Sequence, residues 1–137
     1  LGDRRGSGRT PLGSMKVARK IGEGAPSGAV FKSRQRTGEV IPPNAPGRDP
    51  IVTRIMWLQG MEFVNHNAFS RYIYIHGTPE ERRIGHPASY GCIRMKSKDI
   101  IDLYKRLQVG DEVEVVRHSL DRYKVEEKNG SMQDKKG

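Results

Sequence analysis

The residues best suited to chemistry are a cysteine and a histidine in segment 75–95, IHGTPEERRIGHPASYGCIRM. Cys92 is the only cysteine in the sequence, so it can form neither an intrachain disulfide nor a multi-cysteine zinc site. It is therefore either a small buried side chain or a reactive thiol. A thiol attacks a carbonyl as the thiolate, and an ordinary cysteine needs a nearby imidazole to reach that form at neutral pH. His76 is the candidate for this imidazole.

His76 precedes Cys92 by sixteen positions, which is not the spacing of one helix face, so the chain must fold back to bring the two together. Turn-forming residues for such a fold-back are Gly77, Pro79, Gly85, Pro87 and Gly91. The run Ser89-Tyr90-Gly91 before the cysteine is typical of a nucleophile turn, in which successive backbone N–H groups point at a developing oxyanion. The structural alternative is a buried thiol at Cys92 and a strand-capping histidine.

Strands dominate the elements that must position these residues. The strongest signals are 51–58 and 71–75, which are rich in β-branched and aromatic residues. Shorter strands are expected at 15–20, 29–33 and 112–116. Segment 37–50 contains four prolines and cannot run through a central strand.

One amphipathic helix is expected after the cysteine. Ser97 is the candidate N-cap, and apolar residues at helical spacing follow, namely Ile100, Leu103, Tyr104 and Leu107. Residues 1–120 are thus expected to form one mainly β domain. Residues 121–137 are charged and poor in apolar side chains, which predicts a flexible tail.

The net charge of the 137 residues is +9, which favours an anionic partner such as nucleic acid, a membrane surface or an acidic wall polymer. The basic residues come as scattered pairs without interleaved aromatic residues, which argues against nucleic acid. No apolar run approaches the roughly 20 residues of a membrane-spanning helix. We therefore expect no membrane span in this chain.

Segment 75–95 resembles the signature of the L,D-transpeptidase (YkuD-like) family. The matching residues are His76-Gly77-Thr78, Ile84-Gly85 and Ser89-x-Gly91-Cys92-Ile93-Arg94-Met95. Further segments, such as Arg9-Thr10-Pro11-Leu12-Gly13 and Thr53-Arg54-Ile55-Met56-Trp57-Leu58, extend the resemblance to about residues 5 to 117. It implies a β-sandwich with one helix beside the catalytic loop. Because family domains open with strands before the loop that begins this chain, N-terminal strands are expected to be missing, leaving an exposed sheet edge.

The resemblance also implies a reaction. Cys92 would attack the carbonyl of the third residue of a peptidoglycan tetrapeptide stem, releasing D-Ala and leaving a thioester that an amine of another stem resolves. His76 would be the base, and the Gly77 carbonyl would orient its ring. No metal or organic cofactor is required. The partners would be peptidoglycan stem peptides, with anionic wall polymers as further candidates, and the protein would be exported to the periplasm or cell wall.

Several roles around the pair have alternatives. Arg94 is expected either to hold a substrate carboxylate or to brace the active-site loop. Ser89 is assigned a supporting role in the turn. Tyr90 stands where many family members carry a second histidine, and His86 is a rival base in the same loop.

Two other functions remain open from the sequence. Water in place of the acceptor amine would make the protein an L,D-carboxypeptidase, and residue spacing does not distinguish the two acceptors. A protein of another class would be a non-catalytic wall-binding module that uses the charge of +9. The complete set of His76, Gly91, Cys92 and Arg94 argues against the binding module, which has no need of a nucleophile.

Overall fold

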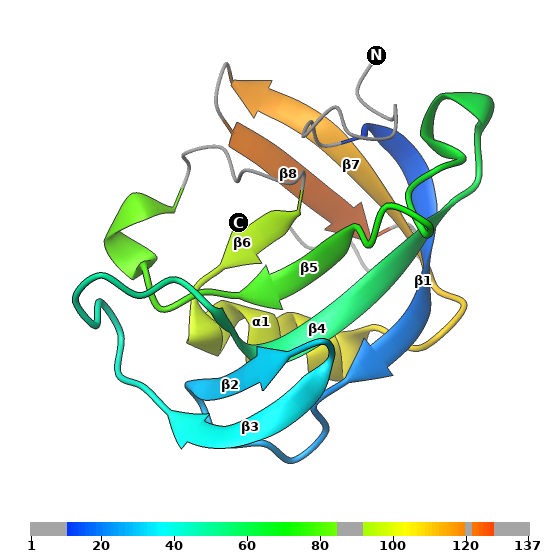
Figure 1. The fold of residues 1–137 in the computed structure, drawn as a ribbon. Helices are drawn as coiled ribbons and strands as arrows, with labels where there is room; N and C mark the ends of the chain where they lie inside the picture. The colour runs from blue at the N-terminus through cyan, green and yellow to red at the C-terminus, as the bar shows by residue number, and fades with distance from the viewer. Residues whose placement is uncertain (1–10, 85–91, 120–121, 128–137) are drawn as a thin grey trace.

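The computed structural model describes residues 11–84, 92–119 and 122–127, and in these the chain forms one curved, mostly antiparallel sheet and one helix (Figure 1). The strands are β1 Gly13–Ile21, β2 Ala29–Lys32, β3 Gln35–Val40, β4 Ile51–Gly60, β5 Tyr74–Gly77, β6 Ile93–Met95, β7 Glu112–Ser119 and β8 Arg122–Glu127. The helix is α1 Ser97–Arg106, and short 3-10 helices occur at Phe63–Asn65 and Glu81–Arg83. This architecture confirms the mainly β fold with one helix. No helix in the described part is both long and apolar enough to cross a membrane.

Strand β4 is the centre of the sheet. The main path runs β3-β2-β4-β1-β7-β8, and β5 pairs with β4 and carries β6 beyond it. Only the β5–β6 pair is parallel among the strand pairs of the described residues. In Figure 1, β4 crosses the middle of the molecule with β5 and β6 on one side and β1 on the other. Strand β1 has partners along both edges, and the expectation of further strands before it stays a prediction.

The two faces of β4 and β5 serve different purposes, because side chains alternate along a strand. Met56 and Ile75 point to the face that packs against α1, where they join a core with Ile100 and Leu103 of the helix. The opposite face carries an aromatic cluster that includes Trp57, and Cys92 packs against it. The helix therefore covers one side of these strands and leaves the other side for the candidate site.

The helix begins differently from the sequence prediction. Ser97 is its first residue rather than its N-cap, and the capping position is taken by Lys96, whose side chain makes no capping hydrogen bond. The Ser97 hydroxyl instead lies 2.6 Å from the Thr53 hydroxyl on β4. Its backbone N–H donates to the Glu81 carboxylate at 3.0 Å. A tertiary contact has thus replaced the local cap that the sequence indicated.

Three other sequence predictions need correction. The strand expected at 71–75 begins later, at Tyr74, because residues 67–72 form turns closed by backbone hydrogen bonds such as Arg71 N–H to Asn67 C=O. Residues 122–127 form β8 along β7 and do not belong to a flexible tail; Val125 is buried in the main core. Strands β3 and β6 were not predicted. The strands expected at 15–20, 29–33, 51–58 and 112–116 are confirmed with small shifts of their ends.

Candidate active site

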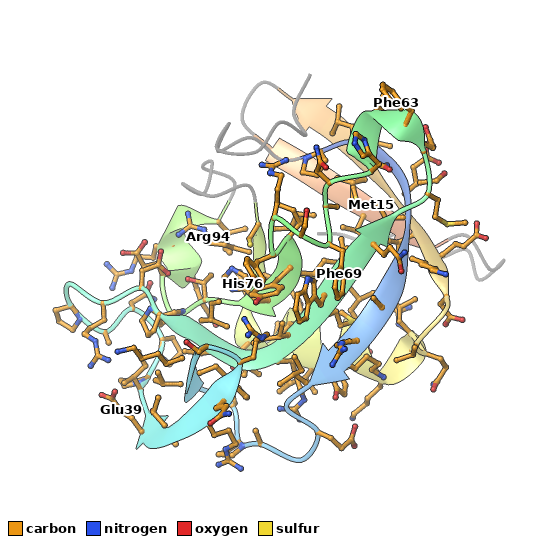
Figure 2. All side chains as sticks on the ribbon, turned by 45° about the vertical axis from the view of Figure 1, so that its right-hand side comes forward. Met15, Glu39, Phe63, Phe69, His76 and Arg94 are labelled. Atoms are coloured by element: carbon orange, nitrogen blue, oxygen red, sulfur yellow. The ribbon has the colours of Figure 1, made fainter. Side chains whose placement is uncertain are left out.

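The parallel pairing of β5 and β6 brings together the two segments that carry the predicted nucleophile and base. His76 lies opposite Arg94 in this pair, and Cys92 is the residue directly before β6. The backbone N–H of Tyr74 on β5 donates to Cys92 Sγ at 3.3 Å. Figure 2 shows His76 between Arg94 and Phe69 on this side of the sheet. The fold-back expected from the turn residues is therefore present.

The Cys92 thiol rests in its protonated form. Its S–H donates to the Tyr72 carbonyl at 3.3 Å. Burial raises the pKa of the thiol, while the Tyr74 N–H and the charge of Arg71 act in the opposite direction. No hydrogen bond between the thiol and the His76 imidazole is found among the contacts of the described residues. The resting pair is consequently not a thiolate–imidazolium ion pair.

The His76 ring is buried, with only 6% of the residue exposed, and its tautomer is fixed by the backbone. Nδ1 lies 2.8 Å from the Gly77 carbonyl, an acceptor, so Nδ1 carries the proton and Nε2 is left with its lone pair. Burial lowers the pKa of His76, against the Gly77 hydrogen bond and the charge of Asp49, which raise it. A neutral imidazole with a basic Nε2 is the form that a general base requires.

These two pKa shifts predict how stability depends on pH. Below the ordinary His value of 6.5 the unfolded chain binds a proton that His76 in the folded chain does not, so stability falls as pH decreases. Above the ordinary Cys value of 9.0 the unfolded chain loses a proton that Cys92 retains, so stability falls as pH increases. Thermal melting between pH 5 and 10 is expected to show both losses; His76→Gln should reduce the acidic one and Cys92→Ala the alkaline one. If each variant loses as much stability at acidic and at alkaline pH as the parent protein, His76 and Cys92 do not cause these losses.

Arg94 braces a loop in this structure. Its guanidinium lies 2.6 Å from the Asp49 carboxylate and 3.4 Å from that of Glu80. The Thr78 hydroxyl donates to the other oxygen of Asp49 at 2.6 Å. Sequence reasoning missed Asp49 and Glu80, because a carboxylate in a proline-rich segment and another in a turn carry no motif. The contacts are those of the bracing role, and substrate contact by Arg94 stays a prediction.

A bulge in β4 sets the position of His76. Val52 pairs with Gly77, and Ile55 pairs with His76. The two residues between them on β4, Thr53 and Arg54, are therefore not paired with residues of β5 and form the bulge. One of them, Thr53, has φ +77°, a conformation that strains a β-branched residue. Its buried hydroxyl accepts the Gly28 N–H at 2.9 Å and also meets the Ser97 hydroxyl. No sequence pattern predicts that a threonine adopts this conformation.

Gly77 has no room for a side chain, which makes Gly77→Ala a test of the packing around the site. An added Cβ would lie 2.5 Å from the Val52 carbonyl oxygen and 3.2 Å from Cγ2 of Ile100. We expect this substitution to lower the free energy of unfolding by about 1–3 kcal/mol, because backbone must move to accept the methyl group. Urea denaturation of both proteins measures the change. A loss below about 0.5 kcal/mol, the usual range for surface substitutions, would contradict this prediction, because it would mean that the backbone of β4 can move away from the methyl group at little cost.

The remaining candidate residues are distributed as follows. Ser89, Tyr90, Gly91 and the rival base His86 lie outside the described residues. His66 is exposed and its Nδ1 lies 2.7 Å from the Phe63 carbonyl, a local contact. Within the described part of the chain, no three His, Cys, Asp or Glu side chains gather as a metal site would require.

The chain matches a known protein-family model. Residues 1–115 match YkuD, the L,D-transpeptidase catalytic domain. Since the match covers most of the 137 residues, the chain belongs to the L,D-transpeptidase catalytic domain family. No curated protein and no solved structure matches the chain.

Proposed function

We propose that this protein is a cysteine acyltransferase of the cell wall, an L,D-transpeptidase with Cys92 as nucleophile and His76 as base. One observation carries the proposal: a buried, neutral imidazole with Nδ1 fixed on the Gly77 carbonyl lies on the strand that binds the thiol. That arrangement offers a proton acceptor on β5 and a nucleophile directly before β6, its partner strand. The membership in the L,D-transpeptidase catalytic domain family supports it.

In the proposed reaction, Cys92 Sγ attacks the carbonyl of the third residue of a tetrapeptide stem as its proton moves to Nε2 of His76. The tetrahedral intermediate collapses when the D-Ala nitrogen takes that proton and leaves, so a thioester remains on Cys92. An amine of another stem then attacks the thioester and passes a proton to His76, which returns it to the departing Cys92 sulfur. We assign the oxyanion to backbone N–H groups at Gly91 and Tyr90, with Ser89 supporting the turn.

The proposal requires one local rearrangement. In the resting structure the thiol is bonded to the Tyr72 carbonyl rather than to His76. Substrate binding must therefore turn the Cys92 side chain so that S–H points at Nε2. Catalytic hydrogen bonds of enzymes commonly tighten only when substrate is bound, so the resting geometry is compatible with the reaction.

Intact-protein mass spectrometry with a tetrapeptide stem tests the proposal. We expect an adduct with the mass of the tripeptide acyl group on Cys92, together with release of free D-Ala. The Cys92→Ala variant is the control and should show no adduct. Chromatography of the products separates a cross-linked dimer, formed by an amine acceptor, from a free tripeptide, formed by water. An unmodified wild-type protein and intact tetrapeptide would reject the acyltransferase and favour a wall-binding protein.

The same proposal includes a cellular setting. A substrate that is part of the cell wall implies export to the periplasm or wall, with peptidoglycan stem peptides as partners. The charge of +9 suits a protein that works among anionic wall polymers.

A further inference from the structure

A groove of about 490 Å³ adjoins the candidate site and carries two arginines. Arg19 of β1 and Arg34 of the β2–β3 turn line it together with Trp57 of β4. The Arg19 guanidinium carbon lies 5.7 Å from the Trp57 ring centroid, and that of Arg34 lies 5.1 Å from it. We call this feature the Arg–Trp groove.

The described residues do not neutralise the positive charge of the groove. No carboxylate within the described ranges pairs with Arg19 or Arg34. Arg34 donates to the Tyr74 hydroxyl at 3.2 Å and lies over the Trp57 and Tyr72 rings, contacts that orient the guanidinium without cancelling its charge. Lys20 also lines the groove, but its ammonium group is bonded to two carbonyls at the end of α1. The two guanidinium groups are therefore the cations available to a ligand.

The position of Arg34 is unfavourable for the turn that contains it. Lys32 pairs with Gln35, so Ser33 and Arg34 form a two-residue hairpin loop with φ values of +50° and +67°. Such loops favour Asn and Gly, and a residue with a side chain costs roughly 1–2 kcal/mol in the left-handed region. The identity of this residue is thus not explained by the stability of the turn, whereas its place over Trp57 gives the guanidinium a fixed direction.

Two tyrosines connect the groove residue Trp57 to the thiol. The rings of Tyr72 and Tyr74 contact Trp57, with centroids 5.5 and 5.7 Å from its ring. The backbones of the same two tyrosines bind Cys92 Sγ. A peptide whose carbonyl reaches Cys92 therefore lies next to a surface that leads to the Arg–Trp groove.

We propose that the Arg–Trp groove is a binding subsite for a carboxylate of the peptide substrate, held by Arg34 and Arg19 over Trp57. Guanidinium groups bind carboxylates through paired charge-assisted hydrogen bonds, and stacking on an aromatic ring leaves their N–H edges directed outward. The inference rests on the proposed function for the identity of the peptide. The carboxylate can belong to the donor stem or to the acceptor stem, since both carry this group.

Binding in the absence of turnover tests the subsite. Calorimetry with Cys92→Ala protein and a tetrapeptide stem is expected to show affinity that falls about tenfold or more when Arg34 and Arg19 are both replaced by Gln. Arg36→Gln is the control for each single replacement, Arg34→Gln or Arg19→Gln: Arg36 is exposed on β3, outside the groove, and its replacement likewise removes one positive charge. Amidation of the stem carboxylates should weaken binding to the Cys92→Ala protein but not to the variant that also lacks both arginines.

Two kinetic measurements show whether the bound carboxylate belongs to the donor stem or to the acceptor stem. In the protein with Cys92 intact, a slower rise of the Cys92 adduct in Arg34→Gln assigns the subsite to the donor. A normal rise followed by slower transfer to an amine-bearing stem assigns it to the acceptor. Arg34→Lys retains the positive charge but not the planar pair of N–H donors. It should therefore bind the peptide more tightly than Arg34→Gln but less tightly than the parent protein.

The subsite is overturned if the arginine variants melt as cooperatively as the parent protein yet bind the peptide equally well, or if Arg36→Gln weakens binding as much as they do. These outcomes are distinct from failure of the proposed function. If no adduct forms on Cys92 but arginine-dependent binding persists, the acyltransferase is rejected and the subsite stands. If the adduct forms and the affinity for the peptide does not change when both arginines are replaced, the subsite alone is rejected.

Discussion

Replacement of Cys92 by alanine is expected to abolish turnover of a tetrapeptide stem, with a loss of at least about 10³-fold in kcat/KM. The reason is that the substitution removes the only atom proposed to bond with the substrate carbonyl. The same variant should fold normally, because it loses one sulfur atom and two weak hydrogen bonds of 3.3 Å. A change in the free energy of unfolding near 1 kcal/mol is the usual size for such a substitution.

Release of D-Ala measures the activity of this variant, and circular dichroism during heating measures its fold. Cys92→Ser is the closer control, since it keeps a hydrogen-bonding side chain in place but supplies a much weaker nucleophile. Turnover by Cys92→Ala within tenfold of the parent protein would rule out covalent catalysis at this position.

Replacement of His76 by glutamine is the second large effect that we expect. Glutamine can still donate to the Gly77 carbonyl from its amide, so the local structure should be kept, but it offers no base to take the thiol proton. General-base catalysis contributes about 10²–10⁴-fold, and kcat/KM should fall by that amount at neutral pH. The loss should shrink at alkaline pH, because hydroxide there ionises the thiol without help from His76.

His66→Gln is the matched control, since His66 is exposed and bonds only to the Phe63 carbonyl among the described contacts. It should leave kcat/KM unchanged. His86→Ala distinguishes the rival base: a loss larger than that of His76→Gln would transfer the role to His86. Stopped-flow measurement of D-Ala release across pH 6–10 provides both comparisons.

The sequence was most informative where a pattern is local. The strand at 51–58 is predicted by its β-branched and aromatic residues, and α1 is predicted by apolar residues at helical spacing. Strand β8 could not be predicted in the same way. Val125 of this strand enters the core, and the strand is held along its length by pairing with β7, a contact that composition does not encode.

In the candidate site, too, some residues could be predicted from the local sequence and others only from the tertiary structure. Cys92 and His76 were predicted as the nucleophile and base from residue type and motif, since a thiol and an imidazole are recognisable in the sequence itself. Asp49 and Thr53 were missed, because their importance arises only from tertiary position: one through the guanidinium of Arg94, the other through a strained bulge behind Gly77. Residues that position others are defined by the fold rather than by their neighbours in sequence.

The position of β1 between β4 and β7 also constrains how the chain reaches its native state. Gly13 pairs with Val115, and Met15 pairs with Gly60, so the first described strand is completed by partners far away in the sequence. Loops of this length must close before their contacts yield any free energy, and folds with such distant pairings typically fold in milliseconds to seconds. Until β7 arrives, one edge of β1 presents unpaired N–H and C=O groups to other chains. Refolding at high protein concentration therefore sets this slow closure in competition with strand pairing between molecules.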